Sequence, residues 1–319
     1  MTMASLPART EARPDVAREA ARKRGDVRIG ISGWTYAGWR SVFYPRGLPQ
    51  SRELRYAAER FRSIEINGTF YRMQRPEHFA SWAEQTPEDF VFSVKAPRFI
   101  THAKKLRDAQ APLANFLASG LLRLGPKLGP LLWQFPPQMR WDPERFDAWF
   151  RLLPRDTEEA VAFAKRHRDH RVEGRAWMQT DAPHLLRHAI EVRHSSFCVP
   201  EFVEMLRAHD LALVVADTVS WPRRMDLTAD FVYCRLHGSK ELYVSGYDDV
   251  DIDAWARRVR AWAAGREPRD AERIGGRAEC RHPRDVFVYF DNDAKVRAPV
   301  DALSLIGRLR RRAAPRSTP

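Results

Sequence analysis

The chain has 319 residues, of which 44% are hydrophobic, with 10 Trp and 17 Phe, and its formal net charge is +13. This apolar content is sufficient for a large core and excludes a disordered chain. The sequence has no run of 18 apolar residues and no apolar segment among its first 28 residues. It therefore predicts neither a membrane span nor a secretory signal, and we expect a cytoplasmic protein with no membrane partner.

Basic residues are concentrated at the two ends of the chain. Residues 1–27 carry six basic and four acidic side chains, and residues 306–319 carry five basic and none acidic. We expect a flexible basic N-terminal extension over residues 1–27 and a disordered basic tail over residues 311–319, on either side of one domain that spans residues 28–310. The smaller positive charge of the remaining chain favours an anionic ligand or a nucleic-acid surface.

Short apolar runs alternate with helix-like stretches through the predicted domain. Helical patterns include residues 51–61, with Ser51 as the expected N-cap, residues 76–86, which begin with Pro76, and residues 251–265, which end on Gly265. The runs typical of buried strands are 28–34, 63–67, 90–96, 130–136, 189–194, 211–218, 231–238 and 286–293. Strands that alternate with helices form parallel sheets, and eight such units predict an α/β fold with a single (β/α)8 TIM barrel.

An open doubly wound sheet is the alternative α/β architecture. Such a sheet more often stops at about five to seven strands and carries a glycine-rich nucleotide-binding turn, which "GISGW" (residues 30–34) does not resemble. The connection over residues 155–188 is longer than a minimal crossover, so we expect either a lid or an excursion on the surface there.

The cysteines of this chain are few and far apart. They form no CxxC pair, so neither a disulfide framework nor a thiolate zinc site is predicted. We expect reduced thiols at Cys198, Cys234 and Cys280.

Polar residues alternate with apolar ones inside several predicted strands. In "SIEIN" (63–67), Ile64 and Ile66 share one face while Glu65 and Asn67 share the other, because side chains alternate along a strand. We expect the isoleucines to pack on helices and the polar pair to point into the barrel. The same parity directs further polar side chains inward: Ser93, Lys95, Glu191, Arg193, Tyr233, Arg235 and His237.

These polar residues lie toward the C-terminal ends of their strands, where TIM-barrel enzymes build their active sites. The other strand ends add Ser32, Gln134, Asp217, Asp291, Asn292 and Asp293. We therefore predict a polar site at the C-terminal mouth of the barrel. Within it, Glu65, Lys95, Glu191, Arg235 and His237 are expected to converge in one cavity.

Several blocks of the chain also resemble a known family. "GISGWTYAGWRSVFYP", "IEINGTFYR", "FVFSVKAPRFITH", "LLWQFPP", "IEVRHSSF", "YCRLHG" and "VYFDND" are similar, in order, to blocks of the domain of unknown function 72, or YecE-like, family. The resemblance implies a TIM barrel with a general likeness to sugar isomerases and to endonuclease IV, and it implies no particular reaction. The chain differs from the family pattern at Asp291-Asn292 and Asp301-Ala302, where the family tends to have asparagine pairs and Asn-Ala.

Three kinds of chemistry are open to these residues. Carboxylates and histidines could bind a divalent metal, but Lys95, Arg193 and Arg235 oppose a metal ion unless they are neutralised. A closed network of ion pairs is the structural alternative. We favour a site without a metal, where the three cations bind an anionic group while Glu65 or Glu191 and His237, with Asp217, exchange protons. A Schiff base on Lys95 is a further option.

The remaining candidates are expected to bind the substrate. Aromatic residues after the first two strands could stack on a sugar or a base, although a hydrophobic loop that packs on its neighbours explains them equally well. The residues predicted to bind substrate are Ser32, Trp34, Tyr36, Asn67, Tyr71, Gln134, Arg193, His194, Arg235, Asp291 and Asn292.

From these residues we expect an enzyme that acts on a small anionic or sugar-like substrate by isomerase-like acid–base chemistry. The main alternative is a protein that binds nucleic acid or processes phosphodiesters. A second alternative is a protein that binds a metabolite without catalysis. The sequence names no cofactor, and a divalent metal is an option that we do not favour.

Overall fold

The computed structural model describes residues 24–278 and 281–311. Its eight strands are all parallel, pair in chain order and close into a barrel through the pairing of β8 with β1. The strands are β1 (Val27–Ser32), β2 (Ser63–Ile66), β3 (Val91–Lys95), β4 (Leu128–Gln134), β5 (His188–Glu191), β6 (Ala212–Asp217), β7 (Phe231–Leu236) and β8 (Asp285–Phe290). The predicted TIM barrel is confirmed. The expected basic extension and tail lie, apart from residues 24–27 and 311, outside the described residues.

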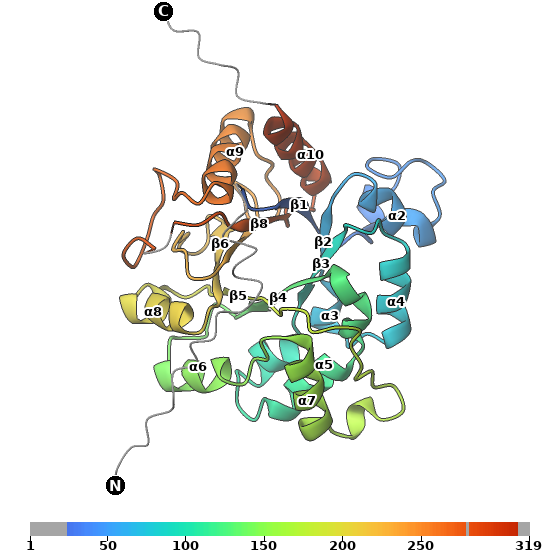
Figure 1. Cartoon of the computed structure of the whole chain (residues 1–319). Coiled ribbons are helices and arrows are strands. Elements are labelled where there is room, and N and C mark those ends of the chain that lie inside the picture. Colours follow the sequence, from blue (N-terminus) through green and yellow to red (C-terminus); the bar gives the residue numbers. More distant parts are fainter. Residues whose placement is uncertain (1–23, 279–280, 312–319) are drawn as a thin grey trace, which may run out of the picture.

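Helices surround the strands on the outside of the barrel (Figure 1). They are α2 (Glu53–Ala58), α3 (Gly68–Tyr71), α4 (Pro76–Glu84), α5 (Gln110–Ala118), α6 (Pro143–Phe150), α7 (Thr157–His167), α8 (Pro200–Ala208), α9 (Asp249–Ala263) and α10 (Arg297–Arg310). Short turns are η1 (Ala37–Trp39), η2 (Gln50–Arg52), the π-helical η3 (Phe99–Ala103), η4 (Leu121–Lys127), η5 (His170–Val172) and η6 (Ser195–Phe197). Residues 218–230 are all described and connect β6 to β7 without a helix.

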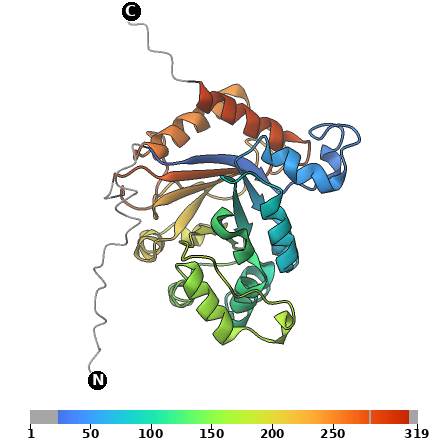
Figure 2. The ribbon, with the colours of Figure 1, turned by 45° about the vertical axis from the view of Figure 1, so that its right-hand side comes forward.

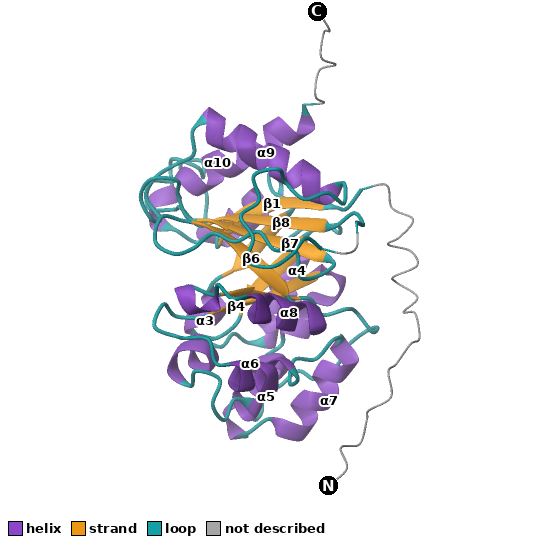
Figure 3. Ribbon diagram, turned by 90° about the vertical axis from the view of Figure 1, so that its left-hand side faces the viewer, coloured by secondary structure: helices purple, strands orange, loops and turns teal. Residues whose placement is uncertain are grey.

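Local signals explain where several helices begin and end. Pro76 occupies the first turn of α4, where its missing N–H costs nothing. Asp248 caps α9 by accepting a hydrogen bond from the N–H of Asp251, and Gly265 follows the helix with a φ of 73°. Figure 3 shows α9 and α10 on one side of the strands and α5 to α7 on the other.

Alternation along the strands separates two apolar regions. One packs between the strands and the helices and includes Ile64, Ile66 and Val94. The other fills the inside of the barrel and includes Ala216, Tyr233 and Tyr289. Because mainly apolar and aromatic side chains fill the middle of the barrel, the charged residues that face inward lie toward the strand ends.

The long connection over residues 155–188 packs on the outside of the molecule. Its helix α7 lies against α5, and Figures 1 and 2 show the two helices side by side. The N–H of Trp177 also donates to the carbonyl oxygen of Ala118, at the end of α5. Among the described residues, we find no helix with the length and apolar composition needed to cross a bilayer.

Candidate functional site

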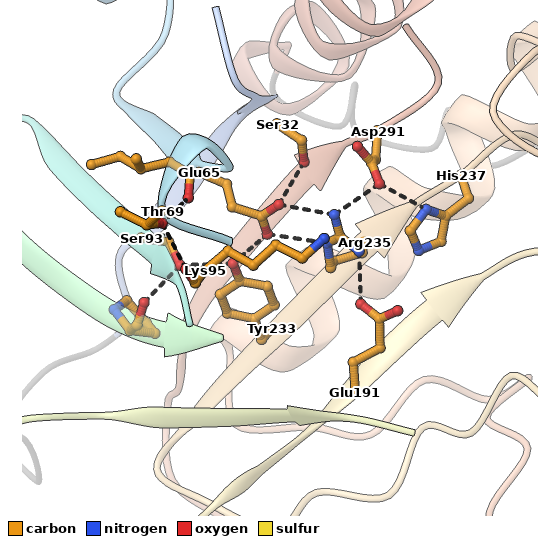
Figure 4. Close-up of polar contacts among 12 residues, drawn as sticks. Ser32, Glu65, Thr69, Ser93, Lys95, Glu191, Tyr233, Arg235, His237 and Asp291 are labelled. Carbon is orange, nitrogen blue, oxygen red and sulfur yellow. Dashed lines mark hydrogen bonds and ion pairs between the residues drawn. The ribbon is translucent and has the colours of Figure 1, made fainter. Parts of the chain in front are cut away.

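The guanidinium of Arg235, on β7, lies at the centre of a buried polar group at the strand ends. Its Nε and Nη2 donate to the two carboxylate oxygens of Glu65 over 3.1 and 2.9 Å. Its Nη1 donates to Glu191 over 2.8 Å, and its Nη2 also donates to Asp291 over 2.8 Å. Figure 4 shows the three carboxylates around the guanidinium. Three strands and the segment after β8 are thus joined through one fully buried cation.

Arg193 supplies a second cation to this group. Its Nε and Nη2 lie 2.8 and 2.7 Å from one oxygen of Glu191, and its guanidinium stacks 4.1 Å from the ring centre of Trp221. We refer to the ion-paired residues as the Arg235 cluster: Glu65, Glu191, Arg193, Arg235 and Asp291. The cluster contains three carboxylates and two arginines, so an adjacent cation is needed to balance it.

Two carboxylates of the cluster, Glu191 and Asp291, are held in their ionised form. Against the effect of burial, Arg193 and Arg235 keep the pKa of Glu191 well below its usual range. Against the same effect, Arg235 keeps the pKa of Asp291 well below its usual range. A carboxylate that is ionised and paired in this way is a poor proton acceptor at neutral pH.

Glu65 is saturated with hydrogen bonds. The register of β1 and β2 places Ser32 beside Glu65, and its hydroxyl donates to the carboxylate over 2.9 Å. The hydroxyl of Tyr233 donates to the other oxygen over 2.6 Å and also lies 2.7 Å from the hydroxyl of Ser93. With Arg235 on both oxygens, Glu65 has no free site for a proton or a ligand. With this geometry, Glu65 fixes the position of the Arg235 guanidinium.

Lys95, the last residue of β3, extends into the barrel beside this cluster. It is 7% exposed, and its Nζ lies 4.3 Å from the ring centre of Phe70. Within the described residues, its amine has no hydrogen bond or ion pair. Burial, reinforced by Arg235, lowers the pKa of Lys95 to about 8, although the three carboxylates act in the opposite direction. Such a pKa leaves roughly a tenth of the amines neutral, and therefore nucleophilic, at pH 7.

His237 lies on the other side of Arg235 and is fully buried. Its Nδ1 is 3.2 Å from Asp291 but lacks the alignment of a hydrogen bond, and its Nε2 has no partner in the described part of the chain. Burial lowers the pKa of His237, so the imidazole is neutral. The rings of Trp221 and Tyr243 pack against it edge-on, 5.4 and 5.2 Å away between centres.

Sequence reasoning missed Tyr243, which follows β7. Its backbone has a φ of 63°, a conformation that is uncommon for residues other than glycine and that often marks functional sites. Burial raises the pKa of Tyr243, with an opposing effect of Arg193, so the phenol stays protonated. The only signal in the sequence is its position shortly after "YCRLHG".

His102 is a second residue that was not predicted, although it ends the quoted block "FVFSVKAPRFITH". It lies in the π-helical turn η3, a type of turn that is frequent at functional sites. Its ring packs edge-on against Phe70, 5.1 Å away, so that His102 and Lys95 share this phenylalanine. Burial and the charge of Lys95 lower the pKa of His102 to about 4.

Several predicted residues do lie with the cluster. Glu65, Lys95, Glu191, Arg235 and His237 converge there, with Asp291, Arg193 and Ser32 in direct contact with its members. Gln134 takes the inward position at the end of β4, where its backbone pairs with Glu191. Tyr36 donates from its hydroxyl to the carbonyl oxygen of Ser32 over 2.7 Å. Asn67 follows β2, and its Oδ1 is buried with no partner among the described residues.

Other predicted residues lie apart from the cluster. Asp217 faces outward, where it accepts hydrogen bonds from Arg223 over 2.8 Å and from Trp255 of α9 over 3.2 Å. Strand β6 directs Ala212, Val214 and Ala216 into the barrel. Because side chains alternate along a strand, Asp217, which follows Ala216, faces the helices outside.

Asn292 also faces outward and donates to Asp301 of α10 over 2.8 Å. His194 accepts a hydrogen bond from the N–H of Ser196 over 3.0 Å, in the turn η6. Trp34 packs edge-on against Trp82 of α4, with 5.2 Å between ring centres.

Tyr71 lies beyond the buried group, and 73% of it is exposed. Its ring contacts Phe70 edge-on at 5.0 Å between centres. Phe70 in turn contacts the amine of Lys95, so Phe70 lies between the exposed ring of Tyr71 and the buried amine.

The arrangement does not match a metal site. The described residues include no group of three or more His, Cys, Asp or Glu side chains in position to hold a metal ion. The guanidinium of Arg235 takes the space between Glu65, Glu191 and Asp291, whose oxygens would otherwise be the natural ligands.

Comparisons with known proteins agree with one another. A family model described as "Protein of unknown function DUF72" matches residues 28–319. The UPF0759 protein YecE of Escherichia coli K12 is 31% identical over 110 residues, which are 34% of this chain and 38% of that protein. The UPF0759 protein YunF of Bacillus subtilis is 29% identical over 122 residues, or 35% of this chain and 40% of that protein. These matches span well under half of the curated relatives.

Two solved structures have the same fold. A protein from Thermotoga maritima aligns with a TM-score of 0.66 and 24% identity, over 89% of this chain and 99% of that chain. A protein from Enterococcus faecalis aligns with a TM-score of 0.61 and 16% identity, over 90% of this chain and 97% of that chain. Both are described as DUF72 family proteins, and at these identities the likeness concerns the fold alone.

Proposed function

Because the chain belongs to the DUF72 family, whose description assigns no reaction, we propose a function from the geometry of the Arg235 cluster and Lys95. We propose an enzyme that acts on a small sugar-like substrate by acid–base chemistry at the C-terminal mouth of the barrel. Lys95 accepts the proton, and the Arg235 cluster holds the surrounding side chains in place.

One observation carries this proposal. Lys95 is a buried amine with no hydrogen bond or ion pair to the described residues, and burial lowers its pKa to about 8. General bases work best when their pKa lies near the working pH. A structural lysine in the same place would be expected to pair with one of the nearby carboxylates, which instead bind arginine.

The carboxylates take a different role from the one that the sequence suggested. Glu65 and Glu191 bind arginines through both of their oxygens, so they orient the site and leave proton transfer to other groups. We assign the role of proton donor to Tyr243, because its phenol is protonated and its ring packs edge-on against His237 beside the cluster. His237 and His102 supply neutral imidazoles nearby.

The charge of the site favours a neutral or singly charged substrate. Lys95, Arg193 and Arg235 balance the three carboxylates, so little positive charge is left for a polyanion. An anionic group of the substrate would lie near Arg193, whose side chain keeps 10% of its surface exposed. A sugar-like substrate satisfies this balance with hydroxyls. A cytoplasmic location is part of the proposal, and the free thiols of Cys198 and Cys234 agree with it.

Solvent exchange tests this function on many candidate substrates at once. The protein is incubated in D2O with a panel of aldoses, ketoses and their monophosphates, and deuterium incorporation at carbon is measured by NMR. We expect exchange with at least one compound, and a loss of about a hundredfold or more in Lys95→Arg. Lys104→Arg, which changes an exposed lysine beside Asp108, is the matched control.

Two results would contradict the proposal. One is exchange that persists unchanged in Lys95→Arg, and the other is the absence of exchange with every compound of the panel. Oligonucleotide binding is measured in the same samples across a salt series, because binding that neutralises phosphates weakens steeply with salt. Strong salt-dependent binding without exchange would favour the nucleic-acid alternative.

A further inference from the structure

We propose that Lys95 reacts covalently with an aldehyde or ketone group of the substrate and forms an imine. This inference deepens the proposed function and rests on it, since both use the same amine. It narrows the substrate class from sugar-like molecules to those that present an open-chain carbonyl. It also adds a covalent step to the acid–base chemistry proposed for the same site.

The position of the amine carries the first part of the argument. Lys95 ends β3 at the catalytic face of the barrel, and its backbone is fixed there by the hydrogen bond from the hydroxyl of Thr69 to its carbonyl oxygen, 2.6 Å long. The Nζ packs over the face of Phe70 at 4.3 Å, with no competing acceptor among the described residues. An amine in such a setting keeps its lone pair available when it is neutral.

Lys127 shows what a structural lysine looks like in the same molecule. Its ammonium donates to the carbonyl oxygens of Ala83 and Thr86 over 2.6 and 2.8 Å and to the hydroxyl of Thr86 over 3.3 Å. All three of its protons therefore have acceptors, which stabilise the charged form against the burial that lowers the pKa of Lys127. Lys95 has none of these bonds, and that difference separates a reactive amine from an anchored one.

Charge balance carries the second part. The Arg235 cluster has three carboxylates and two arginines, so one further positive charge beside it is favourable. The ammonium of Lys95 supplies this charge in the free protein. An iminium formed on the same nitrogen supplies the same single charge after reaction. The cluster therefore stabilises the covalent intermediate without any rearrangement of its ion pairs.

The step balances in atoms and charge. The ammonium first loses a proton, and the lone pair of the neutral amine then attacks the carbonyl carbon, so that a C–N bond forms while the π electrons move to oxygen. Transfer of a proton from nitrogen to oxygen gives a neutral carbinolamine. When the hydroxyl receives the proton released at the start, it leaves as water and the nitrogen lone pair forms the C=N bond. The sum is ammonium plus carbonyl to iminium plus water.

Tyr243 and His102 are positioned to handle these protons. Tyr243, whose backbone has a positive φ, presents a protonated phenol, and its ring packs edge-on against His237. His102 shares the ring of Phe70 with Lys95 and carries a neutral imidazole. The site thus offers a protonated phenol and a neutral imidazole for these proton transfers.

Reductive trapping tests the imine directly. The full-length protein is incubated with dihydroxyacetone or D-glyceraldehyde and sodium cyanoborohydride, and the modified lysine is located by peptide mass spectrometry. We expect modification of Lys95 at least tenfold faster than that of Lys127 in the same molecules. The rate should rise with pH toward a plateau above about pH 8. Lys95→Arg should remove this modification and leave that of exposed lysines unchanged.

Deuterium exchange, measured in parallel, separates the two proposals. Trapping at Lys95 together with exchange supports both. Exchange that depends on Lys95 but without trapping overturns the imine and leaves Lys95 as a general base. Modification of Lys95 at or below the rate of Lys127 also overturns the imine. Because trapping is measured on the wild-type protein, the conclusion does not depend on the folding of any variant.

Discussion

At the scale of single residues, Arg235 organises the site because it is the group with which three carboxylates pair. Its side chain is 0% exposed, and a buried guanidinium is stable only when its donors are satisfied. Glu65, Glu191 and Asp291 meet this need from three different parts of the barrel. Lys95, by contrast, has no such partner in the described residues, and the different roles that we propose for the two cations follow from this difference.

Glu191→Gln tests how strongly the ion pairs hold the site together. The change removes the negative charge that faces both Arg193 and Arg235, and breaking a buried pair costs about 3–5 kcal/mol. We expect the free energy of unfolding, measured by urea denaturation, to fall by this amount. Asp89→Asn is the control, because Asp89 pairs with Arg62 at the surface and should change stability by less than about 1 kcal/mol. An equal loss of unfolding free energy in both variants would mean that the buried ion pairs contribute no more to stability than the surface pair.

Lys95 should make stability depend on pH in the alkaline range. Its pKa falls from 10.5 in the unfolded chain to about 8 in the folded protein, so its burial costs about 3 kcal/mol below pH 8. This cost disappears as the pH rises from 8 to 10.5, because the folded protein releases the proton first. Relative to Lys95→Met, the wild type should therefore gain about 3 kcal/mol over this interval. Parallel curves for the two proteins would contradict a buried, unpaired ammonium.

At the scale of elements, parallel strand pairing brings the site residues together. The register of β1 and β2 sets Ser32 beside Glu65, and that of β4 and β5 sets Gln134 beside Glu191. The inward position that precedes Ser32 on β1 is Gly30, which pairs with Ser63 of β2. A Cβ at Gly30 would lie 1.9 Å from the carbonyl oxygen of Ser63, so the two strands approach too closely there for any side chain.

Gly30→Ala should therefore separate β1 from β2 or prevent folding. We expect a loss of stability of at least about 3 kcal/mol, measured by thermal melting, together with weaker packing of Ser32 on Glu65. Gly307→Ala is the matched control, since a Cβ there meets nothing within 4 Å and lies inside α10. That variant should be stabilised by roughly 0.5–1 kcal/mol. A stable Gly30→Ala would show that the strands can move apart.

Helix ends were predicted less well than strand faces. Ser51 has the residue type of an N-cap, yet it lies inside the turn η2 and Arg52 takes the cap position of α2 without a side-chain hydrogen bond. Asp142 and Asp156, which received no prediction, cap α6 and α7 through their side chains. Which residue becomes the N-cap depends on where the chain turns into the helix, and in this barrel the preceding connection sets that position.

At the scale of the whole molecule, closure of the barrel removes both sheet edges and buries titratable groups far from the mouth. His188 of β5 is fully buried between helices and strand, where Trp133 donates to its Nδ1 over 3.1 Å and its Nε2 lies 2.7 Å from the carbonyl oxygen of Pro154. Burial lowers the pKa of His188 to about 4. Burial also lowers the pKa of His237 at the mouth.

These buried histidines predict a loss of stability in mild acid. Below pH 6.5 the unfolded chain binds protons that the folded protein cannot, so stability falls as the pH drops from 6.5 to 4, by about 3 kcal/mol for His188 alone. Urea denaturation at several pH values measures this slope. In His188→Gln the slope should be smaller, whereas His78→Gln, at an exposed position of α4, should keep it. An unchanged slope in His188→Gln would exclude His188 as the cause.

The inner polar residues were predictable because they follow a rule of local geometry. Side chains alternate along a strand, so Glu65 within "SIEIN" and Arg235 within "FVYCRLHG" had to share a face with their polar neighbours. The same rule, applied to β6, places Ala216 inward and Asp217 outward. The prediction for Asp217 relied on its position at the strand end instead of on parity.

The sequence by itself determined the architecture, because eight alternating units favour one closed parallel barrel and the family blocks span the same region. It also determined which strand residues face inward, since alternation is a local property of the backbone. Only the tertiary structure decided which charges pair, because Arg235 meets Glu65 across 170 positions of sequence and the partners depend on barrel closure. For the same reason, it alone left Lys95 without a carboxylate partner and brought Tyr243 and His102, from loops with no periodic pattern, toward the same site.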